Sequence, residues 1–476
     1  MVRDNKRVML VVPPRTILDS SVKRCCTPIG LGYIAGVLQE KTNYDIYILD
    51  CYAEGYRNEK QKDDGYIKVG LDKKDIVRKI EDFQPDYVGV TCGFTSEIKN
   101  VMDVCRIVKE VDNNINLTVG GLHPSNYPKE TYDMYPEIDS IILGEGDYRY
   151  LDYINGDLKD GIYNSKKHVP FTSVIEDMNT LPFPARNLMN MDIYLKINRH
   201  ISPYPKRERT EQILTSRGCP GKCVFCTSSR FWGHHFRARS PDNVLKEMHQ
   251  LIDNYGIQEF QFTDDTMTLD RKRAMSIFQG MEGLDLSFCM ANGVFVNSLN
   301  EEMMTQMAKS GCYQITFSVE SGSKDSLKRM RKNVNLDRVK PLVKHAKNLG
   351  ISCHGTFVLG IPGDTEEDIM KSFKFARMFD SVSFFEVSPL PGSELYDICI
   401  EKDMLKDLSF DKLDFKNAKV ENPQLSSEKL DLMIRKENNK YVKRFLVKHP
   451  IKFYKKYNRF IKENPKEFLK IFGRVT

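Results

Sequence analysis

The sequence predicts an α/β protein with an amino-terminal doubly wound parallel sheet, a partial (β/α)6 barrel and a helical, basic carboxyl-terminal region. Apolar runs alternate with helical stretches along residues 7–150 and again along residues 211–390, as in chains that build parallel sheets. A composition of 41% hydrophobic and 29% charged residues is typical of a globular protein and excludes a disordered chain. From Arg435 onwards, 14 Lys or Arg stand against 3 Glu, which gives this end a net charge of +11.

Five apolar runs in the first part are typical of strands that a parallel sheet buries on both faces. They are Val8–Val12, Asp45–Leu49, Tyr87–Thr91, Asn116–Val119 and Ser140–Leu143. Helices are expected between them, because residues such as Ile76, Ile80 and Phe83 repeat at helical spacing. We therefore expect a domain over residues 1–150 whose ligand binds at the carboxyl ends of the strands.

A second strand–helix series follows an irregular, proline-interrupted stretch over residues 151–205, which we interpret as a linker. The strands are expected at Gln212–Ser216, Glu259–Thr263, Leu286–Ala291, Tyr313–Val319, Cys353–Leu359 and Val382–Val387. The helices are expected at Pro241–Tyr255, Arg271–Met281, Asn300–Lys309, Leu336–Asn348 and Thr365–Met378. Six such units predict a barrel over residues 206–395 with its chemistry at the carboxyl ends of the strands. Residues 396–476 then form the helical, basic region.

The sequence carries no signal for export or for a membrane span. No apolar run reaches the roughly 18 residues that cross a bilayer, and no small-residue cleavage site follows the first one. We therefore expect a cytoplasmic protein whose twelve cysteines are reduced. Outside the basic tail, which we define as residues 435–476, the net charge is −5. A body of this charge does not predict nucleic-acid binding.

The basic tail interleaves aromatic residues with its cations, and Phe453, Tyr457 and Phe460 fall at helical spacing. One interpretation is a helix that docks across the two domains with a solvated basic face. The other is a peripheral contact with the anionic inner face of a membrane. We favour docking.

Three cysteines lie close together on a loop after the first barrel strand, in the segment TSRGCPGKCVFC. Their spacing is C-x3-C-x2-C. Cys219, Cys223 and Cys226 could each bind one iron of a 4Fe–4S cluster and leave the fourth iron open for another ligand. The alternative is a closed zinc site completed by His234 or His235. Zinc knuckles sit on small hairpins, whereas this loop opens a strand–helix series, so the cluster is favoured.

The cysteine loop, with aromatic Phe225 before its last cysteine, resembles the radical S-adenosylmethionine (radical SAM) superfamily. The resemblance implies a cluster whose open iron binds S-adenosylmethionine and whose electron cleaves it to a 5′-deoxyadenosyl radical. It also implies contacts to S-adenosylmethionine from Phe225, Asp264, Asp265, Ser318, Glu320 and Gly360.

These contacts are matched segment by segment. The stretch FTDD ends the second strand where the family has a Gly-Gly-Glu-like segment, so this sequence departs from the pattern, and Asp264 or Asp265 could accept from the ammonium group. Ser318 and Glu320 end the fourth strand and resemble the family's ribose-contacting segment. Gly360 lies in a segment that resembles the one packing on adenine. Ordinary turns, helix caps or surface carboxylates are the alternatives.

Glycine-rich turns follow the fourth and fifth strands of the first domain, where a ligand could approach the backbone closely. With the barrel, they resemble the radical SAM subclass that carries an amino-terminal, Rossmann-like cobalamin-binding domain. The resemblance implies cobalamin contacts from Gly120, Gly121, Gly144, Glu145 and Gly146. The Asp-x-His-x-x-Gly motif of cobalamin-dependent mutases is absent, so we expect His123 to be a loop residue and not a cobalt ligand.

The resemblance implies a radical SAM methyltransferase that moves a methyl group from methylcobalamin to an unactivated carbon of a small or lipid-like biosynthetic intermediate. A reductant such as flavodoxin or ferredoxin is the implied partner. An oxidative cyclase or ring-rearranging enzyme stays open. So does a methylthiotransferase, whose second cluster would need cysteines among Cys25, Cys26, Cys51, Cys92 and Cys105. A non-catalytic cobalamin or iron sensor is the remaining alternative. No residue is assigned as a catalytic acid or base.

Overall fold

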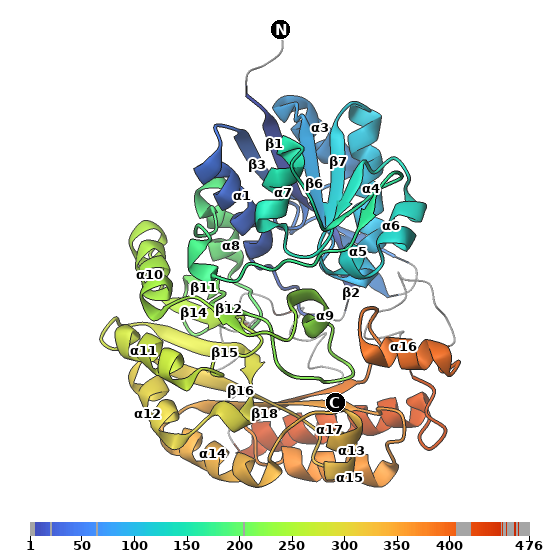
Figure 1. Ribbon diagram of the computed structural model, residues 1–476. Coiled ribbons are helices and arrows are strands. Elements are labelled where there is room, and N and C mark those ends of the chain that lie inside the picture. The colour runs from blue at the N-terminus through green and yellow to red at the C-terminus, as the bar shows by residue number, and fades with distance from the viewer. Residues whose placement is uncertain are drawn as a thin grey trace.

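The computed structural model describes residues 5–448 except 20, 63–64, 203–204 and 406–419, together with residues 450, 454, 461, 462 and 465. An amino-terminal α/β domain lies above an open barrel (Figure 1). The helix α17 (Ser427–Lys448) runs along the lower part of the barrel, and α16 (Glu394–Glu401) lies nearer to the amino-terminal domain. Within the described part of the chain, no helix combines the length and the apolar character needed to cross a bilayer.

The amino-terminal domain is a sheet in the order β10-β9-β8-β7-β6-β1-β3. Its parallel strands are β1 (Arg7–Val12), β3 (Asp45–Asp50), β6 (Tyr87–Thr91), β7 (Asn116–Gly120) and β8 (Ser140–Ile142). The helices of this domain are α1 (Ile29–Lys41), α2 (Cys51–Glu54), α3 (Lys73–Phe83), α4 (Ile98–Val111), α5 (Leu122–Asn126), α6 (Pro128–Met134) and α7 (Gly146–Asn155). All five predicted strands are present, and the chain order reverses beside β1, where such sheets bind ligands.

The sheet continues beyond the boundary that the sequence suggested. β9 (Ile162–Tyr163) and β10 (His168–Val169) add antiparallel to β8, so the stretch 151–205 is a linker only in part, and position 150 falls inside α7. A small antiparallel sheet also escaped prediction, built from β2 (Arg15–Leu18), β4 (Glu59–Gln61) and β5 (Tyr66–Val69). Strands of two to four residues are too short to show a period of two.

The barrel sheet has the order β11-β14-β15-β16-β17-β18, all parallel and sequential. These strands are β11 (Thr210–Ile213), β14 (Glu259–Phe262), β15 (Ser287–Val294), β16 (Cys312–Glu320), β17 (Ser352–Leu359) and β18 (Ser381–Glu386). The helices are α10 (Pro241–Tyr255), α11 (Arg271–Met281), α12 (Glu301–Lys309), α13 (Lys324–Arg329), α14 (Leu336–Asn348), α15 (Glu366–Ala376), α16 (Glu394–Glu401) and α17 (Ser427–Lys448). The prediction of six strand–helix units is confirmed.

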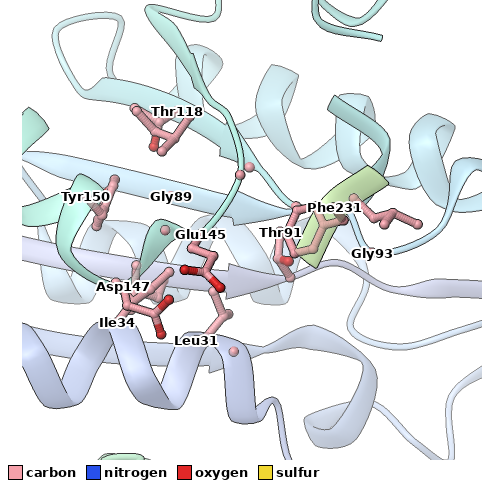
Figure 2. Close-up of a pocket in the computed structure, with 18 of the residues that line it drawn as sticks. Leu31, Ile34, Gly89, Thr91, Gly93, Thr118, Glu145, Asp147, Tyr150 and Phe231 are labelled. Atoms are coloured by element: carbon pink, nitrogen blue, oxygen red, sulfur yellow. The ribbon is translucent and has the colours of Figure 1, made fainter. Parts of the chain in front are cut away.

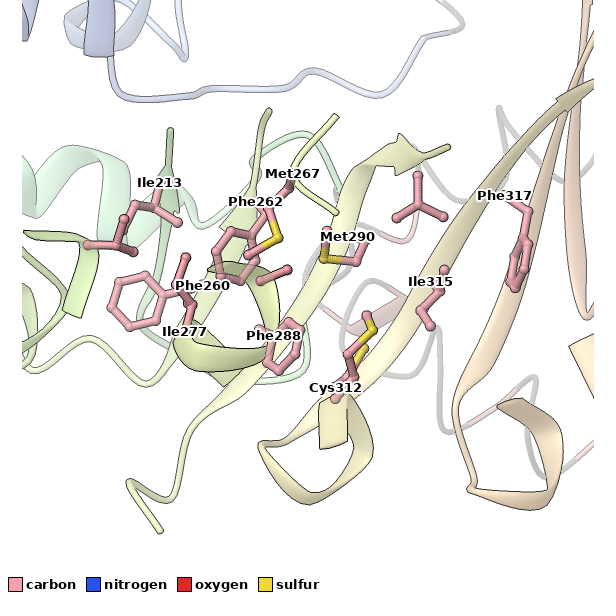
Figure 3. Close-up of a cluster of buried hydrophobic side chains, with 14 of the residues drawn as sticks. Ile213, Phe260, Phe262, Met267, Ile277, Phe288, Met290, Cys312, Ile315 and Phe317 are labelled. Atoms are coloured by element: carbon pink, nitrogen blue, oxygen red, sulfur yellow. The ribbon is translucent and has the colours of Figure 1, made fainter. Parts of the chain in front are cut away.

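Aromatic rings fill the space between the barrel strands and their helices. Phe262, Phe278 and Phe288 are fully buried, with ring centroids 5.4 to 6.3 Å apart. Figure 3 shows Phe260, Phe262 and Phe288 among the apolar side chains on neighbouring strands. Each buried ring contributes roughly 2–3 kcal/mol through the area it removes from water.

A buried carboxyl group stabilises the end of the barrel at which its strands begin. Glu259, at the start of β14, accepts from the backbone N–H groups of Lys206 and Arg207 at 2.6 and 2.8 Å and from the hydroxyl of Tyr313 at 2.7 Å. Burial raises the pKa of Glu259 to about 7. The chain that enters the barrel is thereby held to its second strand.

A buried ionic network joins the two domains through the connecting segment. Arg186, in that segment, pairs with Glu211 of β11 at 3.2 Å and with Glu247 of α10 at 2.6 Å. The hydroxyl of Thr27, just before α1, donates to Glu211 at 2.6 Å. Arg239 also pairs with Glu247. Buried charges of this kind tolerate little movement, because losing one partner leaves the other desolvated.

The described part of the basic tail begins inside α17, which packs against β18. Leu430 and Ile434 of α17 are buried, and the hydroxyl of Tyr441 donates to the carbonyl of Phe379. The first residues of the tail, 435–448, therefore continue a helix that packs on the barrel, and docking of the tail across the two domains stays a prediction. Phe453, Tyr457 and Phe460 lie outside the described residues.

Candidate functional site: a cysteine loop beside an apolar cavity

The three motif cysteines lie on a loop closed by a two-stranded ribbon. β12 (Ser216–Arg217) pairs antiparallel with β13 (Arg237–Ala238), and the loop between them also carries α9 (Ser228–Trp232). Gly218 begins the loop with φ 85°, and a Cβ there would come within 2.1 Å of the carbonyl oxygen of His235. Only glycine permits this close approach, which narrows the neck of the loop.

The thiols of Cys219, Cys223 and Cys226 are partly buried and electrostatically coupled to one another. Gly221 lies between two of them, because a Cβ there would be 3.2 Å from the sulfur of Cys219 and 3.8 Å from that of Cys223. The backbone N–H of Gly221 also lies 3.4 Å from the Cys219 sulfur. Three thiols around a side-chain-free space, with an N–H donor to sulfur, fit the ligand set of a 4Fe–4S cluster.

Protonation of these thiols depends on their surroundings. Burial raises the pKa of Cys226 to about 11 and also raises the pKa of Cys219 and Cys223. The ammonium group of Lys332 acts in the opposite direction on Cys219 and Cys223. Metal binding needs thiolates, so loading a cluster here releases protons. Among the residues described, no group of three His, Cys, Asp or Glu side chains is arranged to hold a single metal ion.

The two predicted aspartates after β14 have different surroundings. Asp264 is buried, and one of its oxygens accepts from the backbone N–H of Thr215 and from the hydroxyls of Thr215 and Ser216 at 3.1, 2.6 and 2.5 Å. Asp265 is partly exposed, accepts from the hydroxyl of Ser228, and interacts electrostatically with the motif cysteines. Asp264 therefore anchors the approach to the cysteine loop, and Asp265 is the carboxylate left facing the cluster side.

Glu320 ends β16 in an unusual backbone conformation. Its φ is 67°, in the left-handed region, and a register shift between Ser318 and Glu320 marks a bulge. Bulges at strand ends commonly re-aim a functional side chain. The buried Glu320 carboxylate lies 3.3 Å from the ammonium group of Lys332, which in turn interacts with Cys223. Burial raises the pKa of Glu320. This pair was not apparent from the sequence as a unit.

The other predicted contacts take part in close packing. A Cβ on Gly293 would come within 2.2 Å of the hydroxyl of Ser318, so β15 and β16 approach closely there. Gly360 has φ 85° and contacts Leu430 of α17, while its N–H donates to Asp364 at 3.2 Å. Phe225 packs against a small apolar cluster beside the cysteine loop. These observations place the residues around the barrel mouth.

A cavity of about 340 Å³ opens at the carboxyl ends of the amino-terminal strands. All five residues assigned to cobalamin line it, namely Gly120, Gly121, Gly144, Glu145 and Gly146. Gly89 and Thr118 line the cavity on the same side as Tyr150, as Figure 2 shows. A Cβ on Gly89 would lie 2.9 Å from the Tyr150 hydroxyl. The wall is largely apolar and glycine-rich, as a large planar ligand with a bulky side arm would require.

The barrel supplies part of this cavity. Phe231 and Trp232 of α9 and Arg217 of β12 line it, although they belong to the cysteine loop and to the ribbon that closes this loop. Figure 2 shows Phe231 on the side of the cavity near Thr91. Trp232 is the single tryptophan of the chain. The sequence does not predict these three residues as cavity lining, because a lining role across two domains leaves no local pattern.

His123 is not among the residues that line the cavity, although the preceding residues Gly121 and Leu122 are. It is buried next to Thr95, with Nδ1 and the Thr95 hydroxyl 3.1 Å apart, and its ring stacks on Tyr127 at 5.8 Å. Burial lowers the pKa of His123 to about 4, so the ring is neutral at physiological pH. His123 lies inside the short helix α5 and not in the loop that the sequence suggested.

Family comparisons agree with both halves of the site. The model of the radical SAM superfamily matches residues 213–376, and that of the B12 binding domain matches residues 15–153. A cytidylyl-2-hydroxyethylphosphonate methyltransferase of Streptomyces wedmorensis is 35% identical over 443 residues, covering 84% of this chain and 83% of the relative. An uncharacterized methyltransferase of Pyrococcus horikoshii is 30% identical over 449 residues, covering 90% and 91%.

Solved structures share the fold. The radical S-adenosylmethionine methyltransferase TsrM of Kitasatospora setae superposes with a TM-score of 0.67 at 16% identity, over 85% of this chain and 78% of that one. The cobalamin-dependent radical enzyme OxsB gives 0.63 at 19% identity, over 91% and 62%. The relatives of 35% and 30% identity, together with the two family models, show that the chain belongs to the radical SAM superfamily, in the group with an amino-terminal B12-binding domain.

Proposed function

We propose that the chain is a cobalamin-dependent radical SAM methyltransferase that alkylates an unactivated carbon of a small biosynthetic intermediate. One observation supports this most strongly. The cysteine loop, with the ribbon that closes it, also forms a wall of the cavity at the B12-binding domain. Two cofactors bound at these places would share one reaction space. The methyltransferase of Streptomyces wedmorensis, similar along most of the chain, points to the same reaction class.

The residues present fit the three cofactors. Cys219, Cys223 and Cys226 would hold the 4Fe–4S cluster, with S-adenosylmethionine on its open iron near Asp265 and Glu320. The apolar cavity would hold cobalamin against its glycine-rich turns. When bound, S-adenosylmethionine with the cluster supplies a 5′-deoxyadenosyl radical, and cobalamin carries the methyl group.

The chain itself positions these groups and keeps water away. Asp264 and Thr215 fix the approach to the cysteine loop, and the buried pair of Glu320 and Lys332 places a carboxylate and a cation at the end of β16. Phe231 and Trp232 cover the barrel side of the cavity with apolar surface. A dry, fixed environment of this kind protects a reactive radical from side reactions.

Two partners complete the proposal. An external one-electron donor such as flavodoxin or ferredoxin would reduce the cluster. A lipid-like substrate at a membrane surface is the second possibility for the substrate class, and the +11 charge of the basic tail is what supports it.

A methylthiotransferase is less well supported, because it needs a second cluster in the amino-terminal domain. Cys51, Cys92 and Cys105 are buried in the apolar core of the sheet, and burial raises the pKa of Cys105 to about 12. Cys25 is buried in the neighbouring core. These thiols are packed as small hydrophobic side chains.

Product analysis tests the proposed function. The enzyme would be purified without oxygen, supplied with iron, sulfide and hydroxocobalamin, and incubated with S-adenosylmethionine, a low-potential reductant and candidate substrates. We expect equal formation of 5′-deoxyadenosine and S-adenosylhomocysteine, since one S-adenosylmethionine yields the radical and a second supplies the methyl group. A loaded enzyme that forms 5′-deoxyadenosine and no S-adenosylhomocysteine with any substrate would contradict methyl transfer.

A further inference from the structure

The ribbon that closes the cysteine loop presents an unusual pair of charges. Arg217 of β12 and Arg237 of β13 are register partners, directly opposite each other. Both side chains are almost fully buried, with 2% and 1% of their side-chain surface exposed. Like charges that face each other across a strand pair are destabilising, and burial increases the cost. The ribbon can therefore exist in this form only if each guanidinium group has an anionic partner.

The partners come from the other domain, and both stand on the cavity wall. Arg217 donates to the two oxygens of Asp147 at 2.8 and 2.9 Å in a bidentate pair. Arg237 lies 2.8 Å from Glu145, which Arg217 also approaches at 3.5 Å. Glu145 and Asp147 flank Gly146, the first residue of α7, and Figure 2 shows both carboxylates on the cavity wall beside Leu31 and Ile34.

The same arginines hold the aromatic wall in place. The guanidinium group of Arg217 lies over the ring of Trp232 at 4.8 Å and over that of Tyr33, from α1, at 5.2 Å. Arg237 donates to the backbone carbonyl of Trp232 at 2.9 Å. The neck of the loop, the tryptophan of its inner face and the acidic turn of the B12-binding domain thus form one connected unit.

We propose that Arg217 and Arg237 are positioning residues that clamp the cysteine loop onto the wall of the corrinoid cavity, so that cluster loading and corrinoid binding reinforce each other. The inference rests on the proposed function for the identity of the two ligands. Ordering the loop around a cluster fixes Arg217 and Trp232, which are part of the cavity wall, and Arg237, which pairs with Glu145 of that wall. By linkage, a corrinoid that meets an ordered wall must in turn favour the loaded loop by the same factor.

The test measures this coupling in the full-length protein and does not depend on turnover. Equilibrium dialysis with hydroxocobalamin, assayed as cobalt, gives the Kd for the cluster-free and the cluster-loaded enzyme. Emission of Trp232 reports occupancy of the cavity in the cluster-free form. We expect cluster loading to lower the Kd at least fivefold, the lower end of typical coupling between sites.

Variants locate the coupling in the clamp. Arg217→Lys and Arg237→Lys keep the charge but lose the fork that matches a carboxylate. For both we expect a Kd ratio near one, with the cluster-free Kd within about twofold of the unchanged protein. Arg186→Lys is the matched control, since Arg186 is a buried arginine between two glutamates of the same domain interface but lines no part of the cavity. It should keep the ratio.

The outcomes separate this inference from the proposed function. If hydroxocobalamin binds equally well with and without the cluster, the clamp proposal fails and the proposed function stands. If the ratio survives in both arginine variants, the clamp proposal fails as well. If no corrinoid binds in either form, cobalamin dependence fails and the clamp with it.

Discussion

Hydrogen bonds between Asp264 and Thr215 connect the end of the second barrel strand to the start of the cysteine loop. One carboxylate oxygen of Asp264 accepts from both the backbone N–H and the hydroxyl of Thr215, at 3.1 and 2.6 Å. The next residue, Asp265, makes its contact with Ser228 inside the loop. The two adjacent carboxylates therefore have different roles: that of Asp264 stabilises the backbone, and that of Asp265 faces the reaction space.

The two aspartates should respond differently to the same substitution. We expect Asp265→Asn to weaken S-adenosylmethionine binding about tenfold or more, because it removes the anionic partner proposed for the ammonium group, with little change in stability. Asp264→Asn should lower the free energy of unfolding by roughly 1–3 kcal/mol, since buried donors lose a charged acceptor. Isothermal titration of the cluster-loaded enzyme and urea unfolding separate the two effects. Equal affinities for both variants would contradict this division.

Substitution of any motif cysteine should remove the cluster. Cys219→Ala, Cys223→Ala and Cys226→Ala are expected to bind substoichiometric iron and to lose dithionite-dependent cleavage of S-adenosylmethionine, because each thiolate holds a different iron. The fold should survive, since these side chains are only partly buried. Cys26→Ala, at another partly buried cysteine, is the control and should keep both properties. Stoichiometric zinc without iron after anaerobic reconstitution would refute the cluster assignment.

The cavity can be filled without disturbing the protein. Gly30, at the start of α1, lines the cavity, and a Cβ at this position meets no atom within 4 Å. We expect Gly30→Leu to weaken corrinoid binding at least tenfold and Gly30→Ala to have a smaller effect. Stability should be kept or slightly raised, because glycine costs about 1 kcal/mol relative to alanine inside a helix. Spectroscopic titration with hydroxocobalamin measures the series. An unchanged affinity for Gly30→Leu would show that the corrinoid binds elsewhere.

The buried carboxyl of Glu259 predicts a pH dependence of stability. Its pKa is about 7 in the folded protein, above the ordinary value of 4.5. The folded state therefore binds the extra proton between these values, so stability should fall as the pH rises from about 4.5 to 7 and level off above. The total change is roughly 3 kcal/mol. Urea unfolding at several pH values should show this slope, and Glu259→Gln should flatten it, whatever its effect on absolute stability.

The carboxyl-terminal region should divide into a docked part and a dispensable part. Removing residues 449–476 is expected to leave a soluble, cofactor-binding enzyme, whereas removal from position 427 exposes apolar surface beneath Leu430 and Ile434 and should destabilise the barrel. Each basic residue near an anionic surface contributes about 1 kcal/mol. Sedimentation with anionic liposomes at low and high salt tests whether the full chain binds membranes. No binding at low salt would exclude the membrane contact.

The main strands and the cysteine motif could be predicted from the sequence, because each follows a regular pattern along the chain. Five apolar strands in one domain and six in the other follow from hydrophobic period, and the three cysteines follow from spacing. β9 and β10 were missed, since two residues cannot display a period. The packing of α17 on β18 was not predicted, because periodicity tells which face of a helix is buried and not what covers that face.

Within the site, residues near the cysteines in sequence could be assigned, and those brought there by the fold could not. Lys332 approaches Glu320 from a turn after α13. Arg217 is part of the motif segment, yet its partner Asp147 is seventy residues away in the other domain. A positive φ at Glu320 is likewise invisible to pattern analysis, because glutamate rarely adopts it.

The ionic network of Arg186 bears on how such enzymes diversify by recombination. Thr27 belongs to one domain, Arg186 to the connector, and Glu211 and Glu247 to the barrel, and hydrogen bonds and ion pairs link these buried groups. A chimera that joins the first domain of a relative to this barrel would leave a buried charge without its partner, unless the connector and Thr27 come from the same protein as the barrel. A single crossover that keeps these partners together therefore lies before α1, inside the first domain, and not at the boundary between the two domains.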